Sequence, residues 1–338
     1  MNENLKNRLE LILEKQPRSL LAKASTELSH RYRDKDRDKT IFFMATDEDR
    51  LAYLACRFPA TYSTVHRALI ECQRHCPDFF PTSMNDIGAG PGTATLAALD
   101  LFLSLKEVNL YERDAKWLEI GKSLMNQTDY PLLKTVSWNP TDLAQDNDFN
   151  PSDMSVLSYV VGELPVNTMI KLVDRVLIST KEIFVVIEPG TPHGFERIRL
   201  IRSHLLEKGL NLVAPCPHQN KCPMEKDDWC HFSNRVERSS IHRAVKGAAM
   251  GYEDEKFSYV IASKKVVPLP ESRIIRHPQH HSGHIDLFVC CQNGLEKKII
   301  SKKQKSLYKQ TRKSQWGDIF PPIVLKDSVD EIKDTYSD

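Results

Sequence analysis

Three cysteines within fifteen residues form the densest group of potential metal ligands in the sequence. Cys216, Cys222 and Cys230 are separated by five and seven residues, and a proline follows each of the first two. Thiolates at this density are typical of a zinc or iron–sulfur site, and the spacing does not separate the two. No apolar secretion signal precedes them, which argues against a disulfide framework. A fourth ligand must come from elsewhere, and the candidates are His218, His231, Cys290 and Cys291.

A glycine-rich loop follows a short apolar run and precedes a helical pattern. Its sequence is Asp86-Ile87-Gly88-Ala89-Gly90-Pro91-Gly92-Thr93, which matches neither the dinucleotide fingerprint nor the P-loop. It resembles the first motif of class I S-adenosylmethionine (SAM) methyltransferases. Glu112 ends the next apolar run, about twenty residues on, where a carboxylate can bind both ribose hydroxyls, and Asp142 could meet the adenine amino group. The residues expected to bind SAM are Asp86, Gly88, Gly90, Gly92, Glu112 and Asp142.

The end of the fourth apolar run is where a methyl acceptor would be activated. It lacks the Asn/Asp-Pro-Pro-aromatic motif of many amino-group methyltransferases, and no Pro-Cys nucleophile stands there. Tyr159 and Glu163 are the candidates for a general base or a stacking platform. The sequence therefore predicts a cofactor loop without an identified catalytic residue.

A basic segment near the C-terminus points to nucleic acid. Residues 297–313 contain eight Lys or Arg and no acidic residue, in a chain whose formal net charge is only +2. Such a one-sign cluster neutralises phosphates. Upstream histidines include His280, His281 and His284, which we expect to extend this RNA surface, or simply to lie exposed, rather than to form a zinc site. The expected RNA-binding residues are Lys297, Lys298, Lys302, Lys303, Lys305, Lys309, Arg312 and Lys313.

The elements that must position these residues follow from periodicity. Short apolar runs recur every 20–30 residues and alternate with helical stretches, which is typical of a parallel sheet with crossover helices. We predict an α/β chain with a helical N-terminal region (1–80), a class I SAM-methyltransferase (Rossmann-like) domain (81–265, with the cysteine segment at 214–232), a small β-rich basic module (266–325) and an acidic flexible tail (326–338). The strands are expected at Met84–Ile87, Val108–Tyr111, Thr135–Trp138, Met154–Val160, Ile183–Ile187, Phe257–Ala262, Ile285–Val289 and Ile299–Ser301.

Composition limits the class of protein. The 338 residues are 41% hydrophobic and 27% charged, as in globular proteins. No run approaches the ~18 apolar residues of a membrane helix. A cytoplasmic protein is expected, or one of the mitochondrial matrix if a eukaryotic precursor was trimmed.

Several blocks of the sequence, the glycine loop among them, resemble a known family over roughly Asp86 to Phe320. This family is the methyltransferase-like small-ribosomal-subunit assembly proteins. The blocks are Asp86–Gly92, Ile187–Pro192 with Gly194-Phe195, Ala214–His218, Asp228–Phe232, Tyr252–Tyr259 and Trp316-Gly317-Asp318. This resemblance implies a SAM-binding fold with a four-cysteine [4Fe–4S] cluster that docks on small-subunit ribosomal RNA. It assigns Cys216, Cys222 and Cys230 as the first three ligands and Cys290 as the fourth, with Cys291 as the fallback.

Three functions follow as hypotheses. The first is a SAM-binding, iron–sulfur factor that binds small-subunit ribosomal RNA during ribosome assembly or translation, as a monomer off the ribosome and without a membrane. The second is an active SAM-dependent ribosomal RNA methyltransferase. The third is a non-catalytic RNA-binding protein stapled by zinc. If Cys290 ligates a cluster, the cluster would be structural and its loss would disorder the basic module.

Overall fold

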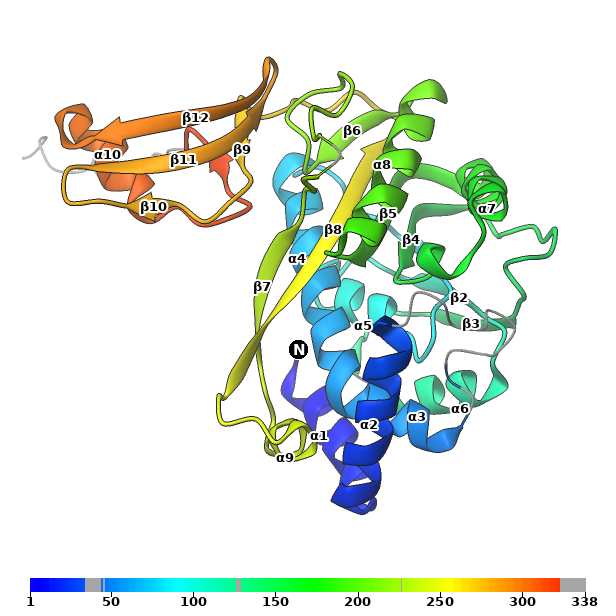
Figure 1. Cartoon of the computed structure of the whole chain (residues 1–338). Coiled ribbons are helices and arrows are strands. Elements are labelled where there is room, and N and C mark those ends of the chain that lie inside the picture. The colour runs from blue at the N-terminus through cyan, green and yellow to red at the C-terminus, as the bar shows by residue number, and fades with distance from the viewer. Residues whose placement is uncertain (34–43, 45, 126–128, 226, 323–338) are drawn as a thin grey trace, which may run out of the picture. The chain divides into compact units, whose positions relative to one another are not determined.

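The computed structural model of the chain places its strands in two separate sheets (Figure 1). The described residues are 1–33, 44, 46–125, 129–225 and 227–322. They divide into two compact units, Met1–Leu269 and Pro270–Asp338. The predicted acidic tail at 326–338 lies outside the described residues.

The large sheet of the first unit has the strand order β3-β2-β1-β4-β5-β8-β6, with β7 also paired to β8. Strands β1 to β5 are mutually parallel, and β8 runs antiparallel to its neighbours. This order, with an antiparallel strand inserted before β6, is that of the class I SAM-methyltransferase fold, so the predicted fold class is confirmed. The strands are β1 (Ser83–Ile87), β2 (Glu107–Glu112), β3 (Thr135–Pro140), β4 (Ser152–Ser158), β5 (Thr180–Pro189), β6 (Asn211–Ala214), β7 (Phe232–Glu237) and β8 (Tyr252–Ser263).

Helices of the first unit begin where the sequence supplies caps. Asp114 accepts a hydrogen bond from Lys116 N at the start of α6, and Thr191 accepts one from Gly194 N at the start of α8. Short polar side chains at this position satisfy amide groups that the helix leaves unpaired. The helices are α1 (Glu3–Glu14), α2 (Arg18–Arg33), α3 (Asp47–Ala52), the π-helical η1 (Tyr53–Arg57), α4 (Phe58–His75), α5 (Thr93–Leu99), α6 (Ala115–Leu124), the 3-10 turn η3 (Val161–Glu163), α7 (Val166–Ser179), α8 (Pro192–Glu207) and α9 (Ser240–Lys246).

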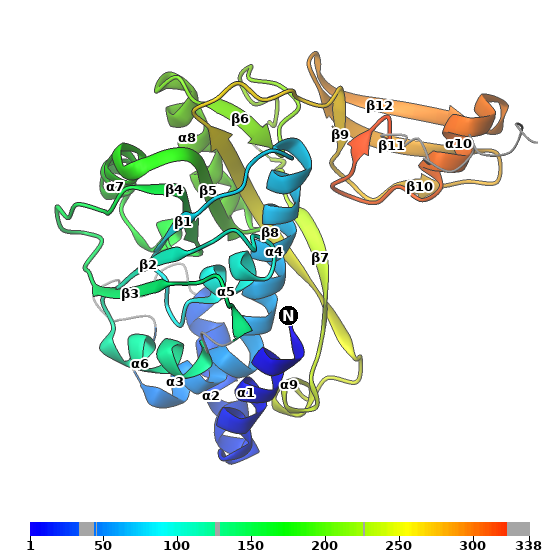
Figure 2. The same cartoon turned by 180° about the vertical axis from the view of Figure 1, so that it is seen from behind.

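Helices cover both faces of the large sheet. Helices α7 and α8 lie on one face and α4 on the other, as the two opposite views show (Figures 1 and 2). Phe184 and Val186 of β5 are fully buried in the core beneath α7 and α8. Helix α4 is tied to the far end of the sheet by Asn234 of β7, which donates to Ser63 Oγ at 2.6 Å. The sheet is thus buried on both sides, as parallel sheets require.

The N-terminal helices also contact the segment that follows the carboxyl end of β2. Arg50 of α3 donates to the Asp114 carboxylate at 2.6 and 3.0 Å, and the Tyr53 ring meets Trp117 edge-on with centroids 5.2 Å apart. These contacts join the helical region to the turn that follows β2. Region 1–80 therefore belongs to the same compact unit as the sheet.

The second unit is a small antiparallel sheet around its own core. Its order is β10-β11-β9-β13, with β12 also paired to β11. Ile285, Leu287 and Val289 of β11 are buried in that core. The elements are β9 (Ser272–Ile274), β10 (Gln279–His280), β11 (His284–Cys291), β12 (Gly294–Ser301), the 3-10 turn η4 (Lys302–Gln304), α10 (Lys305–Thr311) and β13 (Ile319–Phe320). Within the described residues of both units, no helix is both long and apolar enough to cross a membrane.

Candidate cofactor and cluster sites

The glycine loop turns away from β1 at the carboxyl edge of the sheet. Gly88, Gly90 and Gly92 have φ values of +73°, +53° and +81°, in the left-handed region that residues with a Cβ avoid. A Cβ on Gly88 would lie 2.2 Å from Val160 Cγ2, whereas one on Gly90 would meet nothing within 4 Å. Gly88 is therefore needed for packing, and Gly90 leaves open space beside the backbone. In open α/β sheets, ligands bind at this edge where the strand order reverses, here between β1 and β4.

Asp86 of β1 holds the first turn of α5, the helix that follows the glycine loop. Its Oδ2 accepts hydrogen bonds from Thr95 N at 2.9 Å and Thr95 Oγ1 at 2.8 Å. The Asp86 side chain is buried, and its Oδ1 has no hydrogen-bond partner. Burial raises the pKa of this carboxyl to about 6. A buried carboxylate oxygen without a donor is costly, which makes Oδ1 a natural acceptor for a donor group on a ligand.

Glu112 lies beside the loop, as its position after β2 predicts. Its two oxygens accept hydrogen bonds from Gly90 N and Asp114 N, each at 2.9 Å. Burial is the largest cause that raises the pKa of this carboxyl, and these two bonds oppose it. The structure therefore brings Asp86, Glu112 and the three glycines together.

Asp142 occupies a turn after β3 and uses one oxygen there. Its Oδ1 accepts from Ala144 N at 3.0 Å, an Asx-type turn. The adjacent Leu143 side chain would lie 3.4 Å from a Cβ on Gly88. The turn thus borders the glycine loop.

The end of β4 carries a strained tyrosine. Tyr159 has φ +59°, which is uncommon for a bulky residue and occurs chiefly at functional or over-determined positions. Its hydroxyl lies 3.0 Å from Thr64 Oγ1 of α4. Burial raises the pKa of Tyr159 far above its usual range, so this hydroxyl stays protonated at neutral pH and is unsuited to act as a base. Glu163 is exposed on η3.

A third buried carboxylate, Glu188, was not identified from the sequence. It ends β5 in the block Glu188–Pro192, and its Oε1 accepts from Val161 N at 3.0 Å. Burial raises the pKa of Glu188 to about 8. Glu188 therefore holds the turn after β4, where Tyr159 stands, and the acidic residue at a strand end was the available signal.

The cysteine segment joins β6 to β7, and both strands pair with β8. Ala214 is opposite Ile261, and Phe232 is opposite Phe257. The carbonyl of Cys230 accepts from Ser258 Oγ at 2.8 Å, between these two register points. Trp229 Nε1 donates to Gly190 O at 3.0 Å. Segments that are far apart in sequence are thus hydrogen-bonded around the cysteines.

Arg202 of α8 organises the first part of this segment. Its Nε donates to Cys216 Sγ at 3.2 Å, and its Nη2 donates to the carbonyls of His218 and Asn220 at 3.2 and 2.7 Å. Burial raises the pKa of Cys222, and the Cys216 thiol is close enough to raise it further. The Arg202 guanidinium thus places a positive charge beside the Cys216 thiol.

The three thiols are more widely spread than a compact metal site. Among the described residues, the group whose ligand atoms all lie within 4.8 Å of one another is His281, His284 and Asp286, and none of the cysteines belongs to it. Sulfur atoms around one tetrahedral zinc ion are about 3.8 Å apart, from Zn–S bonds of about 2.3 Å.

The two candidate fourth ligands are adjacent on β11 of the second unit. Successive side chains of a strand point to opposite faces. Cys291 shares the face of Val289, which is buried in the unit's core, and is itself buried, whereas Cys290 is half-buried on the opposite face. Burial raises the pKa of Cys291. The strand geometry therefore favours Cys290 over Cys291 as a ligand.

The basic residues fall into two groups. Lys297 pairs with Asp286 at 2.8 Å, and Lys298 pairs with Glu271 at 3.4 Å. Six others are exposed on η4, α10 and the turn that follows, with no acidic partner among the residues that the structure describes. Tyr308 packs against the core of the second unit. The six exposed residues, called the basic surface below, are Lys302, Lys303, Lys305, Lys309, Arg312 and Lys313.

Comparison with known proteins gives a family match over most of the chain. The family model described as mitochondrial small ribosomal subunit Rsm22 matches residues 47–321. The human mitochondrial ribosome assembly protein METTL17 is 26% identical over 300 residues, which cover 81% of this chain and 62% of that protein. The Rsm22-cox11 tandem protein 2 of Schizosaccharomyces pombe is 26% identical over 331 residues, which cover 82% of this chain and 43% of that protein. The chain thus spans less than two thirds of the length of these two relatives.

A solved structure is also similar. It is the magnesium protoporphyrin IX methyltransferase of Synechocystis with bound SAM, with a TM-score of 0.43 and 14% identity, covering 69% of this chain and 100% of that one.

The two glycines of the loop predict different costs of substitution. Gly88→Ala and Gly90→Ala each place a Cβ in the left-handed region, at about 1–2 kcal/mol. Only Gly88→Ala also drives that Cβ into Val160, at about 1–3 kcal/mol more. Urea unfolding should therefore show a clearly lower free energy of unfolding for Gly88→Ala. Equal losses for the two variants would contradict this account of the loop.

Proposed function

The chain belongs to the Rsm22 family, and on that premise we propose that it is a SAM-binding, iron–sulfur factor that binds small-subunit ribosomal RNA during ribosome assembly. The observation that carries this proposal is the family match over residues 47–321. Relatives named as mitochondrial ribosome assembly proteins support it. We propose that it acts where its ribosome is assembled, in the cytoplasm or in the mitochondrial matrix.

The glycine loop supports SAM as the ligand of the first unit. Asp86 Oδ1 lacks a donor, and the Cβ position of Gly90 faces open space. We propose that Asp86 accepts from the amino group of SAM, that Glu112 exchanges its bond to Gly90 N for the ribose hydroxyls, and that Asp142 borders the adenine. Bound SAM would supply an electrophilic methyl group next to the turn after β4.

The cysteine segment supports a cluster rather than a single zinc ion. The donor set of three thiols fits either group, and the family resemblance favours the cluster. We therefore propose Cys216, Cys222 and Cys230 as ligands, with Cys290 as the fourth. The Arg202 donor to Cys216 Sγ suits an anionic cluster.

The basic surface supports RNA as the partner. Its six cations are exposed and are not neutralised by acidic residues of the described chain. Phosphate contacts of this kind provide affinity without sequence specificity. Lys297 and Lys298 are already paired with carboxylates, so we expect them to contribute less than the other six.

A second candidate function is methyl transfer to ribosomal RNA. The observation that favours it is the left-handed backbone of Tyr159 at the acceptor end of β4, because strain of this kind concentrates at functional sites. The protonated hydroxyl would donate a hydrogen bond to an acceptor rather than remove its proton.

The SAM proposal predicts binding that depends on Gly90. Equilibrium dialysis with labelled SAM should give one bound SAM per chain, and Gly90→Arg should weaken this binding at least tenfold, because its side chain fills the open space. Gly209→Arg is the matched control, since Gly209 also has a left-handed φ of +80° and nothing within 4 Å of its Cβ position. Equal SAM affinity in the two variants would refute the assignment.

The same labelled SAM separates the two candidate functions. Anaerobically purified protein is incubated with isolated small-subunit particles, and label is sought in the RNA. Label that is lost in Gly90→Arg would establish the methyltransferase, whereas SAM binding without transfer would leave an assembly factor that uses SAM only as a ligand.

The RNA proposal predicts a loss of affinity on charge reversal. Replacing Lys302, Lys303 and Lys305 by Glu should weaken binding to a small-subunit ribosomal RNA transcript and flatten its salt dependence by about one unit of slope per lost phosphate contact. The control makes the same charge change at exposed lysines of the first unit, Lys15, Lys23 and Lys122. A similar loss in the control would show that net charge, rather than this surface, governs binding.

The cluster proposal predicts that stability and RNA affinity fall together. Cys222→Ser should remove iron, lower the thermal midpoint of unfolding and weaken RNA binding, because the proposed fourth ligand belongs to the same unit as the basic surface. Cys76→Ser, at a half-buried thiol outside the segment, should retain iron. Unchanged RNA affinity in iron-free Cys222→Ser protein would rule out the coupling, and zinc in place of iron would support the zinc-stapled alternative.

A further inference from the structure

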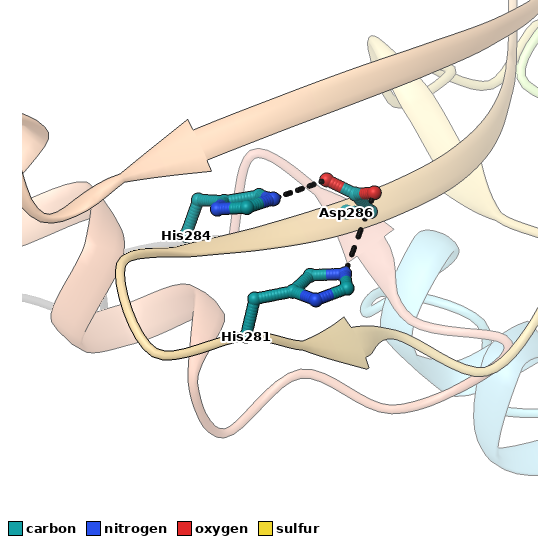
Figure 3. A group of neighbouring side chains, drawn as sticks. All are labelled: His281, His284 and Asp286. Atoms are coloured by element: carbon teal, nitrogen blue, oxygen red, sulfur yellow. Dashed lines mark ion pairs between the residues drawn. The ribbon is translucent and has the colours of Figure 1, made fainter.

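We propose that His281, His284 and Asp286 form a second metal site, which binds a divalent transition-metal cation of the zinc class. The three residues converge on the hairpin formed by β10 and β11 in the second unit (Figure 3). All three donors are nitrogen or oxygen, so this site differs in chemistry from the cysteine segment. It replaces the expectation that these histidines only extend an RNA surface.

The hairpin explains why the three side chains meet. His281 N donates to His284 O at 2.9 Å across the turn, which holds His281 beside the start of β11. His284 and Asp286 are two residues apart on β11 and therefore point to the same face. This is the face opposite Ile285 and Leu287, which are buried in the core of the unit.

The separations of the donor atoms fit a shared cation. His284 Nε2 lies 3.4 Å from Asp286 Oδ1, and His281 Nε2 lies 3.6 Å from Asp286 Oδ2. Donors bonded to one tetrahedral zinc ion at about 2.0–2.1 Å lie about 3.4 Å apart. The two imidazole rings are stacked, with centroids 4.5 Å apart and planes at 15°. Both Nε2 atoms point to one carboxylate (Figure 3).

A buried oxygen without a hydrogen-bond partner is the independent sign of a ligand. The Asp286 side chain is only 7% exposed, and its Oδ1 has no hydrogen-bond partner. Its other oxygen, Oδ2, pairs with the Lys297 ammonium at 2.8 Å. Lys297 thus orients the carboxylate, as partners of metal-bound carboxylates do, and leaves Oδ1 available for a cation.

Metal binding requires neutral imidazoles, because their nitrogen lone pairs coordinate the cation. Lys297 already pairs with the Asp286 carboxylate. Three protein ligands leave a fourth position for water. The cation would also link the β10–β11 turn, through His281, to β11.

The test uses the full-length chain and Zn²⁺ itself. Equilibrium dialysis followed by elemental analysis should show one zinc per chain fewer in the double variant His281→Ala/His284→Ala than in the wild type. His280→Ala is the control, because His280 is exposed on β10 outside the group. Both histidines of the double variant are at least 40% exposed, so its fold should survive. Circular dichroism without metal checks this.

Cobalt distinguishes the site from the cysteines. Difference spectra between wild type and double variant loaded with Co²⁺ should show weak d–d bands without sulfur-to-metal charge transfer. Added Zn²⁺ should also raise the thermal midpoint of the wild type and His280→Ala more than that of the double variant. Equal zinc content in wild type and double variant would overturn the proposal. A cobalt difference spectrum that contains sulfur-to-metal charge transfer would also overturn it, because the lost site would then include a cysteine.

Discussion

The register of β8 is the constraint on which the arrangement of the first unit depends. One edge of β8 pairs with β5, and the other edge pairs first with β7 and then with β6. The two ends of the cysteine segment are consequently fixed opposite Phe257 and Ile261, four residues apart, or about 13 Å along the strand. The three cysteines lie on the loop that joins these two fixed points. The same strand places Ser258 against the carbonyl of Cys230.

Buried carboxylates at the carboxyl edge form the second organising feature. Asp86, Glu112 and Glu188 lie at the carboxyl ends of three different strands. They accept hydrogen bonds from backbone amides of the first turn of α5, the glycine loop and η3, respectively. Each turn is thus held by a side chain from another position in the fold rather than by its own residues. Because burial raises the pKa of all three, their charges are poorly solvated. A cationic ligand bound at this edge would relieve this cost, which is a physical argument for the proposed SAM site.

Local sequence patterns predicted many of the helices and strands. They could not predict contacts between residues that are distant in sequence. Runs such as Val108–Tyr111 and Ile183–Ile187 became β2 and β5 because a buried parallel strand needs continuous apolar residues. Strand β7 was missed because Phe232–Glu237 carries charged and polar residues on an edge strand. The glycines and Glu112 could be found from spacing along the chain. The roles of Glu188 and Arg202, and the contact of Tyr53 with Trp117, could not be found in this way. They depend on partners that are distant in sequence.

In the histidine cluster, the sequence groups the imidazoles, and the strand register adds the carboxylate that lies beside them. A basic stretch rich in histidine predicts a surface for phosphate, and the net charge of the segment supports that interpretation. The strand register adds what composition lacks, a buried Asp286 placed beneath two imidazoles by alternation along β11. Lys297, counted among the cations for RNA, neutralises that carboxylate instead. The basic surface therefore begins after β12, at Lys302, and the hairpin beside it carries the donor set that we propose to bind a metal ion.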